Sequence, residues 1–565
     1  MPDILTYDQL INETDSEKVY LAEIEPALKM TGWQLAPGQT NTYQAAVDAG
    51  MAVCRLKEEK TDLVQKQSVA EVEANPGSWF FDPAAEILYA HSSDSASPDS
   101  HYMTAYFLET FATHPRVFNN RFYQPKIALI PEFRRSVNEK SAGNTIQSSG
   151  RLAMLEDSAQ PYWSQTLYKY NWLNKRVTLK LGGAHEDYPY SEFKTVARWI
   201  LKGNTYTDTG VEFEVADLKN IFMTRIGLNR YDTATYPNMD PAAEGGTIQI
   251  AFGQIANARA VLIDSATGVG GKWKLSLFAV NSIDAVYDDG TPAPFTADLA
   301  NGEFTLNAAA QGLITADFTG LKDGANYLRR GGEISKYILL NLLSLPASDI
   351  VAADFDALDA ARPYTLGIYI ERATRADEIL SAIEKSNHSF FYTDRATGAI
   401  RTQVFADPDN ADPQRVLLNN DNLFDFQVET DRNIAHEINV SYGRDFASGE
   451  SKFIRKTSLG SAYINDSEES VSIDTYLANK ADAEVLGDIL LPFYSRPRIL
   501  AQATTHIRPL DRNLFDNVEA NRNQRPALPD QQYTYRLLGS RERAAKDKKR
   551  VTLTLSKNIQ PGEAG

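Results

Sequence analysis

Cysteine and histidine, the side chains most typical of zinc sites and activated nucleophiles, are few and scattered in this 565-residue chain. Cys54 is the sole cysteine, so no disulfide can form within the chain, and we expect it to be a small buried hydrophobic residue. None of the histidines stands in an HExxH or CxxC setting, the spacings that bring zinc ligands together. We therefore expect no metal and no cofactor. The histidines lie at positions 91, 101, 114, 185, 388, 436 and 506.

Two short stretches resemble ligand loops in part. ATGVGGKW (266–273) lacks the first glycine of a phosphate loop, and Trp273 stands where Ser or Thr would bind magnesium. DPDNAD (407–412) lacks the glycine and the glutamate of a calcium loop, which predicts an exposed acidic turn. Carboxylates are abundant, but no pattern selects a pair for glycoside hydrolysis. The sequence thus predicts no catalytic, cofactor-binding or metal-binding residues, and no enzyme activity.

A basic run, RERAAKDKKR, occupies positions 541–550. Two apolar strand patterns, YTYRLLGS (533–540) and VTLTLSKN (551–558), flank it, so the first interpretation is a solvated hairpin. The second is a basic loop that faces acidic neighbours or DNA in a channel. Both interpretations stay open at this point.

The elements around these residues are clearer, above all in the stretch 375–405. Thr374 and Asp377 have the spacing of a helix start, apolar residues then recur on one helical face, and Asn387 is a plausible left-handed stop. Phe390 begins an aromatic strand, and the turn at 394–398 leads into a second, alternating strand. The pattern predicts an αββ packing unit.

Strand patterns dominate elsewhere. RVTLKLGG (176–183) and VEFEVADL (211–218) alternate apolar and polar residues, and YDDG (287–290) predicts a hairpin turn. HEINVSYGRD (436–445) repeats the alternation and final glycine of RVTLKLGG, which hints at an internal duplication. A later helix is predicted to end at Pro492.

The bulk composition narrows the class of protein. The net charge is −17, which argues against a general nucleic-acid binder, since such a protein needs a basic face. Hydrophobic residues make up 43% of the chain, enough for sizeable cores. The first residues show no signal peptide, and the longest apolar run (337–345) is too short to cross a bilayer, so we expect no stable membrane insertion.

The order of segments resembles the baseplate hub proteins of phage tails, of the siphophage and Mu-like transposable siphophage type. YQPKIALIP (123–131), YNWLNKRVTLKLGG (170–183) and VEFEVADLKNIF (211–222) are similar to the first barrel of such hubs, and the stretch 248–320 is similar to their β insertion. The stretch 338–405, which includes the αββ unit, is the most specific match, and 476–558 resembles the second barrel.

The resemblance implies a mainly β fold with α+β inserts, in which two small antiparallel β-barrel or sandwich hub domains are separated by a β insertion and an αββ unit. The αββ unit would be a wedge between the barrels, with its aromatic strand buried and its turn facing a partner or solvent. The expected domains are an N-terminal β-rich attachment or peripheral domain (1–120), the first hub β-barrel (121–240), the β insertion (241–330), a helix plus αββ linking domain (331–420), the second hub β-barrel (421–558) and a flexible tail (559–565).

The resemblance also implies a function without covalent chemistry. A homotrimer with two barrels per chain would adapt a hexameric tail tube to a three-fold tip. The implied partners are the distal tail protein, the tape-measure protein, a central spike or fibre and other tail-tip proteins, and phage DNA would pass without sequence-specific binding. The expected location is the virion tail tip, after assembly in the host cytoplasm. The alternatives are a distal tail or receptor-binding tail protein and a tail-associated cell-wall hydrolase.

Overall fold

A computed structural model describes most of the chain. The described residues are 18–47, 53–59, 61–118, 121–130, 133–137, 145–146, 149–156, 161–185, 187–395, 397–406, 412, 415–418, 423–431, 433–464, 468–505, 513–520, 534–545 and 548–558.

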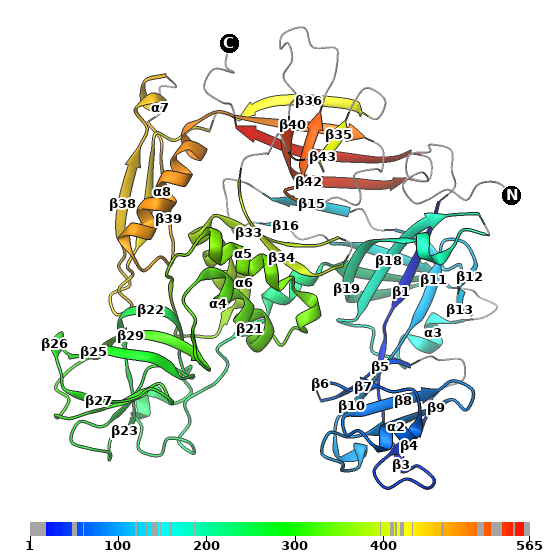
Figure 1. The fold of residues 1–565 in the computed structure, drawn as a ribbon, viewed down its shortest axis with the longest axis horizontal. Helices are drawn as coiled ribbons and strands as arrows, with labels where there is room; N and C mark the ends of the chain where they lie inside the picture. The colour runs from blue at the N-terminus through cyan, green and yellow to red at the C-terminus, as the bar shows by residue number, and fades with distance from the viewer. Residues whose placement is uncertain are drawn as a thin grey trace.

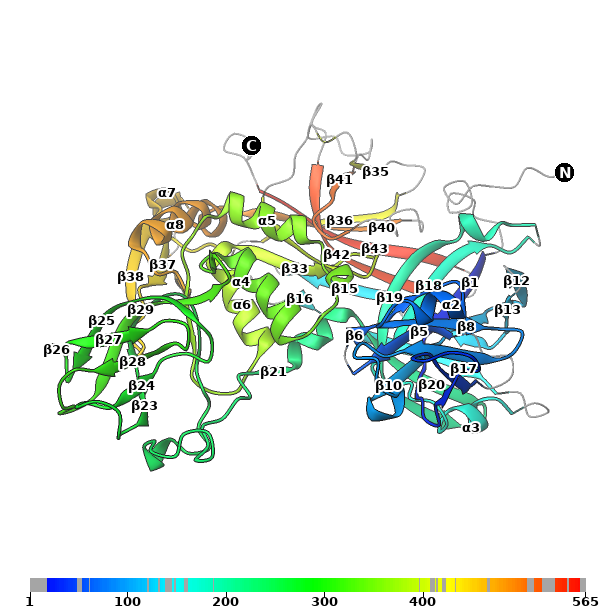
Figure 2. The same cartoon turned by 60° about the horizontal axis from the view of Figure 1, so that its bottom comes forward.

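The fold is mainly β, with several antiparallel sheets and a few helices, and this confirms the predicted fold class. Two large sheets form a body together with a group of helices, and two smaller β lobes project from the same side of it (Figure 1). Figure 2 shows the same two lobes after a rotation of 60°. No helix in the described part of the chain is long and apolar enough to cross a membrane.

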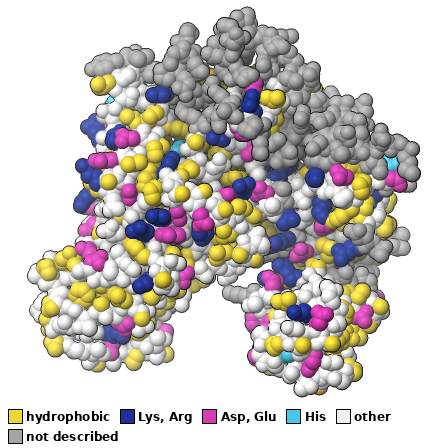
Figure 3. All heavy atoms as spheres, viewed as in Figure 1, with side chains coloured by type: hydrophobic (Ala, Val, Ile, Leu, Met, Phe, Trp, Pro, Cys, Tyr) yellow, Lys and Arg dark blue, Asp and Glu magenta, His cyan; other side chains and the backbone are white. Residues whose placement is uncertain are grey.

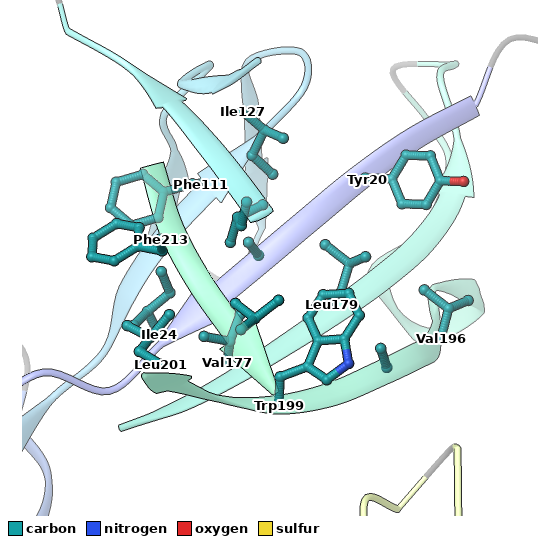
Figure 4. Close-up of a cluster of buried hydrophobic side chains, with 14 of the residues drawn as sticks. Tyr20, Ile24, Phe111, Ile127, Val177, Leu179, Val196, Trp199, Leu201 and Phe213 are labelled. Carbon is teal, nitrogen blue, oxygen red and sulfur yellow. The ribbon is translucent and has the colours of Figure 1, made fainter. Parts of the chain in front are cut away.

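A seven-stranded sheet holds the first predicted barrel segment, in the order β11-β1-β18-β19-β20-β17-β14. Val177, Leu179 and Leu181 are fully buried, as the alternation in RVTLKLGG predicts. Figure 4 shows Tyr20, Leu179 and Trp199 among the side chains of the buried cluster that this sheet lines. The strands are β1 (Lys18–Ile24), β11 (Glu109–Ala112), β14 (Ile127–Leu129), β17 (Ser149–Leu155), β18 (Arg176–Gly183), β19 (Lys194–Thr207) and β20 (Gly210–Ala216).

This sheet crosses the domain boundary expected at residue 120. β1 pairs with β18 along its whole length, from Lys18↔Gly183 to Ile24↔Val177, and β11 pairs with the other edge of β1. The N-terminal region therefore supplies two strands to the sheet that was expected to begin at residue 121. Its remaining strands form a projecting lobe.

This N-terminal lobe is built from two small sheets and short helices. They comprise β2 (Ala27–Lys29), β3 (Gln34–Leu35), β4 (Tyr43–Ala46), β5 (Val53–Glu58), β6 (Thr61–Asp62), β7 (Val64–Gln65), α2 (Val69–Glu73), β8 (Ser78–Asp82), β9 (Ile87–His91) and β10 (Met103–Phe107). The hairpin of β12 (Arg116–Phe118) and β13 (Arg121–Tyr123) and the short helix α3 (Trp163–Thr166) flank the seven-stranded sheet.

The second large sheet has eight strands and takes two of them from far away in the sequence. Its main path is β16-β15-β42-β43-β40-β36, and β41 pairs with β42 and with β35. The strands are β15 (Phe133–Val137), β16 (Thr145–Ile146), β35 (Val416–Leu418), β36 (Leu423–Asp431), β40 (Arg498–Thr505), β41 (Asn517–Ala520), β42 (Thr534–Ala545) and β43 (Lys548–Asn558).

The second projecting lobe is the β insertion. Tyr287↔Pro292 and Asp288↔Thr291 pair around Asp289 and Gly290, so the hairpin predicted from YDDG is confirmed. Both turn residues have positive φ, 47° and 79°, as a primed two-residue turn requires. The lobe contains β22 (Ile250–Arg259), β23 (Val261–Asp264), β24 (Lys272–Lys274), β25 (Val280–Asp288), β26 (Thr291–Pro292), β27 (Phe295–Asp298), β28 (Glu303–Leu306), β29 (Ile314–Asp323), β30 (Asn326–Tyr327) and β31 (Gly367–Ile370).

The helical part lies between the two large sheets and the β insertion in Figure 1. It contains α4 (Gly331–Tyr337), a π-helix (Ile338–Leu342), α5 (Ala352–Ala361), α6 (Ala376–Asn387), β33 (Ser389–Thr393) and β34 (Ile400–Val404), and β21 (Arg225–Ile226) pairs with β32 (Thr374–Arg375) beside it. A separate unit consists of α8 (Lys480–Ser495), α7 (Leu459–Ile464) and a sheet of β37 (Glu437–Tyr442), β38 (Lys452–Thr457) and β39 (Ser470–Ile473).

Two local expectations in this region are wrong. HEINVSYGRD forms β37 in the three-stranded sheet beneath α8, so it is no counterpart of RVTLKLGG in the seven-stranded sheet. Pro492 lies inside α8, which continues to Ser495. A proline removes only one backbone donor, and the last turn of this helix is completed after it.

Candidate functional site: two matching β units and their junction

Each large sheet contains a unit of four consecutive strands with the same topology. We call 149–216 (β17, β18, β19, β20) the first β unit, and 498–558 (β40, β41, β42, β43) the second β unit. In the first, the spatial order is β18-β19-β20-β17, and in the second it is β41-β42-β43-β40. In both units the order is therefore second, third, fourth and first strand, and every neighbouring pair is antiparallel.

The third strand of each unit carries an irregularity at the same place. The pairing of β19 with β20 shifts between Leu201 and Gly203, and the pairing of β42 with β43 shifts between Leu537 and Gly539. In each case a single residue, Lys202 or Leu538, is inserted between a buried leucine and a glycine. A bulge of this kind bends the hairpin and increases its twist. The two units therefore share one strand order and one bulge position.

The buried faces of both units belong to one hydrophobic cluster. Val211, Phe213 and Val215 of β20 are buried, and Val551 and Leu553 of β43 repeat the same alternation. Since successive side chains of a strand point to opposite faces, this pattern leaves one face of each hairpin toward the core. The two units are thus packed through a common core rather than connected by a flexible linker.

The two hairpin tips differ in charge. The first tip has the sequence NTYTDTG (204–210), and Gly210 has a φ of 150°, where a Cβ would lie 1.9 Å from the carbonyl oxygen of Met154. The second tip carries the basic run 541–550, whose described backbone pairs as strands up to Ala545↔Lys548. This pairing is the one that the hairpin interpretation predicts.

The αββ unit (376–404) joins the two β units, and its aromatic strand β33 faces both. Phe390 packs against Phe515, in the segment that leads into β41, with ring centroids 5.2 Å apart. On the opposite face of the strand, Phe391 packs against Phe222, in the turn that follows β20, at 6.1 Å, and against Phe355 of α5 at 5.9 Å. Both phenylalanines are fully buried. One strand therefore contributes to two separate clusters.

The turn of the αββ unit also lies between the two units. Arg395 donates from Nε to the carbonyl of Val196 in β19 at 2.6 Å, and its backbone N–H donates to Asn513 Oδ1 at 3.1 Å. Arg198 of β19 donates to the carbonyl of Thr397 at 2.7 Å. Asp394 and Arg395 are only 8% and 7% exposed, whereas Thr397 is exposed, so the start of the turn is buried in the junction and only part of it faces solvent as expected.

Buried polar groups fix the peptide of Phe391. Lys219 donates from Nζ to the Phe391 carbonyl at 2.7 Å, and the Phe391 N–H donates to the Glu384 carboxylate. Both charged side chains are buried. Burial raises the pKa of Glu384 to about 7 and lowers the pKa of Lys219, because each charged form loses its hydration. The contact connects the chain just after the first β unit to the strand at the centre of the junction.

His388 and Arg498 lie in the aromatic cluster on the second-unit side. The ring centroids of His388 and Phe493 are 5.0 Å apart. The guanidinium carbon of Arg498 lies 4.1 Å from the same Phe493 centroid. Arg498 is fully buried and donates to Ser556 Oγ of β43 at 3.1 Å. Burial lowers the pKa of His388 to about 3, so the imidazole is neutral in the folded protein.

The predicted helix ends in the αββ unit need correction. Thr374 Oγ1 donates to the carbonyl of Arg372, and Arg375 occupies the N-cap with its guanidinium paired to Asp377. At the other end, Asn387 is the last helical residue and donates to the Ile383 carbonyl at 2.9 Å. His388 takes the left-handed conformation instead, with a φ of 47°.

The other residues singled out in the sequence do not converge on these units. Cys54 is half-buried, and burial raises the pKa of its thiol to about 12, which disfavours a reactive thiolate. The stretch 266–273 comprises most of the loop between β23 and β24 and the first two residues of β24. His506 and most of DPDNAD lie outside the described residues. Among the described residues, Glu58, Asp94 and His101 form a cluster that no linear motif could have revealed.

No protein-family profile matches the chain, and no curated protein matches it in sequence. Solved structures of tail proteins are similar to it. The tail protein from Neisseria meningitidis MC58 has 8% identity and a TM-score of 0.35, with 78% of this chain and 95% of that one covered. The 43 kDa tail protein of prophage MuSo2 from Shewanella oneidensis has 9% identity and a TM-score of 0.34, over 78% and 96% of the chains. A chain of the native gene transfer agent virion has 14% identity and a TM-score of 0.37, over 60% and 89%.

Proposed function

We propose that this chain is a structural baseplate hub protein at the tip of a phage-type tail, and that it acts as a trimeric symmetry adaptor. The observation that carries the proposal is the pair of matching β units, with one strand order and one bulge position. Three chains would present six such units around an axis. A hexameric tube would then meet six similar surfaces, while the rest of each chain follows three-fold symmetry.

The junction supports this role because an adaptor must keep its two units in a fixed relation. Phe390 and Phe391 contact opposite sides, and Arg395 reaches both units. Such contacts resist relative motion of the units, since packed aromatic clusters and buried hydrogen bonds have few alternative arrangements. A rigid spacing is what a ring of alternating units requires.

The proposed partners are the distal tail protein on the tube side, and the tape-measure protein, a central spike or fibre and other tail-tip proteins on the remaining faces. Phage DNA would pass through the ring without sequence-specific contacts. Among the described residues on the face seen in Figure 3, Lys and Arg side chains are interspersed with Asp and Glu. The role needs no covalent chemistry. The proposed location is the virion tail tip, after assembly in the host cytoplasm.

The mass of the purified chain in solution tests the proposal. The chain is 62.8 kDa, so a closed three-fold ring would have a mass of about 188 kDa by light scattering. A trimer, or a monomer that antibody labelling then locates as three copies at the tail tip, supports the adaptor role. A stable hexamer would favour the distal tail ring and contradict it. Labelling along the tube or on peripheral fibres would contradict it as well.

A further inference from the structure

Three segments of the N-terminal lobe bring together side chains that are typical metal ligands. Glu58 ends β5, Asp94 lies in the turn after β9, and His101 precedes β10. One ligand atom from each residue lies within 4.8 Å of the other two. The cluster lies outside the two β units and their junction, so the proposed hub function does not account for it.

Glu58 is the unusual member of this cluster. Its side chain is only 6% exposed, and one carboxylate oxygen, Oε2, accepts from the Ser93 N–H at 3.0 Å. The other oxygen, Oε1, is buried and accepts no hydrogen bond from the described residues. A buried carboxylate oxygen without a donor is costly, and each such group in a folded protein calls for a compensating partner.

His101 sets the geometry around that oxygen. Its Nε2 lies 3.0 Å from Asp94 Oδ1, and the Ala96 N–H holds the same Asp94 oxygen at 2.9 Å. A neutral histidine that donates from Nε2 keeps its lone pair on Nδ1. Nδ1 lies 3.4 Å from Glu58 Oε1. In that tautomer the Nδ1 lone pair faces the Glu58 oxygen, and a cation between them, either a metal ion or a proton on Nδ1, would stabilise the arrangement.

We propose that a divalent transition-metal ion, with Zn²⁺ as the best fit, binds between Glu58 Oε1 and His101 Nδ1. Two ligands at about 2.0–2.1 Å from a tetrahedral zinc ion are roughly 3.4 Å apart, which matches the observed separation. Asp94 is then the positioning residue, because a carboxylate behind a ligating histidine fixes its tautomer and ring orientation. Water completes the coordination. The mixture of imidazole and carboxylate favours Zn²⁺ over Ca²⁺ or Mg²⁺.

This ion would cross-link the end of β5 and the segment before β10, while Asp94 supports the histidine from the turn after β9. The binding therefore stabilises the lobe rather than catalysing a reaction, and it contradicts the expectation from sequence that the chain holds no metal. A motif search does not find Glu58, Asp94 and His101, because Glu58 is far from the other two in the sequence. They meet only when the end of β5, the turn after β9 and the segment before β10 come together in the folded lobe.

The test uses the full-length chain without an affinity tag, stripped with EDTA and titrated with ZnCl₂ by calorimetry. We expect one Zn²⁺ per chain and a thermal transition that rises on addition of the ion. His101→Gln should abolish this binding. Asp94→Asn, at a half-exposed side chain, should fold normally and weaken the binding by about 10- to 100-fold, because it changes only the support of the ligand. His185→Gln, at an exposed histidine 3.7 Å from Asp187, is the matched control and should bind like the wild type.

Cobalt binding gives a second measurement, which distinguishes the metal ligand His101 from the positioning residue Asp94. The Co²⁺-loaded chain should show ligand-field absorption that is lost in His101→Gln and retained in Asp94→Asn at saturating metal. Equal Zn²⁺ binding by the wild type and His101→Gln would overturn the proposal. It would also be overturned if Zn²⁺ did not bind and only acidification stabilised the lobe, because a proton on His101 would then occupy the gap. Since the readouts need no tail assembly, failure here leaves the hub proposal untouched.

Discussion

The two β units share a backbone plan but differ in what surrounds it. The first unit is extended by β1 and β14 at its edges, and its hairpin tip is polar and has few charges. The second unit is extended by β15 and β36, and its tip is strongly basic. The bulge residue is the partly exposed Lys202 in one and the buried Leu538 in the other. Two units with one strand order can thus keep their pairing while their surfaces differ. In the proposed ring, this difference would allow two similar positions to contact different neighbours.

The junction offers the strongest way to separate the units. Phe390→Ala and Phe391→Ala should each cost about 3–5 kcal/mol of unfolding free energy, because each empties a fully buried site. Hydrogen exchange should become faster in the second β unit for Phe390→Ala. It should become faster in the turn after β20 for Phe391→Ala. Polar residues at both positions should prevent folding or assembly. Fully assembled, infectious particles that carry both polar changes would rule out the role of this strand as a wedge.

The residues at the two bulge positions differ in burial, so we expect them to differ in their contribution to stability. Leu538 is 3% exposed and packs in the cluster with Phe390, so Leu538→Ala should cost about 2–5 kcal/mol. Lys202 occupies the same place in the first unit but is partly exposed, so Lys202→Ala should change stability by no more than about 0.5 kcal/mol. Denaturant unfolding of the two variants measures the difference. Equal losses would mean that the two bulges are supported in the same way.

Acid–base titration separates the two sides of the junction. His388 has a folded pKa of about 3 against an ordinary 6.5, so it makes stability fall as pH drops through that window. Glu384 has a folded pKa of about 7 against 4.5, so it makes stability fall as pH rises through 4.5–7. Between pH 4.5 and 6.5 the two slopes oppose each other.

Single variants should therefore unmask opposite slopes, each of up to about 1.4 kcal/mol per pH unit. Relative to wild type, His388→Asn should make stability decline more with rising pH, and Asn also tolerates the left-handed backbone. Glu384→Gln should make stability increase more with rising pH. Urea unfolding of both variants and the wild type at several pH values measures the slopes. Parallel curves for all three would contradict the assignment.

The smallest stability effect and the largest assembly effect are expected at the hairpin tips. Replacing 541–550 with a neutral polar sequence of equal length should change the unfolding free energy by about 0.5 kcal/mol or less if the run is solvated, as the hairpin interpretation expects. If the basic charge of this run distinguishes the second β unit from the first in the proposed ring, the neutral variant should fail to form assembled tails. A tip with the same basic residues in shuffled order is the control. Normal tails with the neutral tip would show that this charge has no role in assembly.

Local pattern predicted the strands well because alternation is a property of neighbouring residues. Val177, Leu179 and Leu181 face the core as expected, and the turn at Asp289 and Gly290 is where its sequence places it. Helix ends were less predictable. Thr374 binds a nearer carbonyl and Asn387 is held in the helix by its own side chain, so competing local hydrogen bonds decided both positions.

Long-range pairing could not be obtained from the sequence. HEINVSYGRD matches RVTLKLGG in alternation, yet the counterpart of β18 in strand order is β41, whose short sequence NVEA carries no such pattern. β1 joins the first sheet from the start of the chain, and Glu58 meets His101 only after β5 pairs with β10. Nothing local specifies the partner strand, and the functional clusters depend on that partner.

The pairing of β15 with β42 has a consequence for synthesis. Phe133 lies opposite Glu542, so a strand made early must wait for a partner that is made roughly 400 residues later. At about 5–20 residues per second, the ribosome needs roughly 20–80 s to supply it. During that time the nascent chain exposes an incomplete edge. The order of translation thus leaves the second β unit to be completed last, and premature contact between unfinished copies is a hazard that its production in the cell has to avoid.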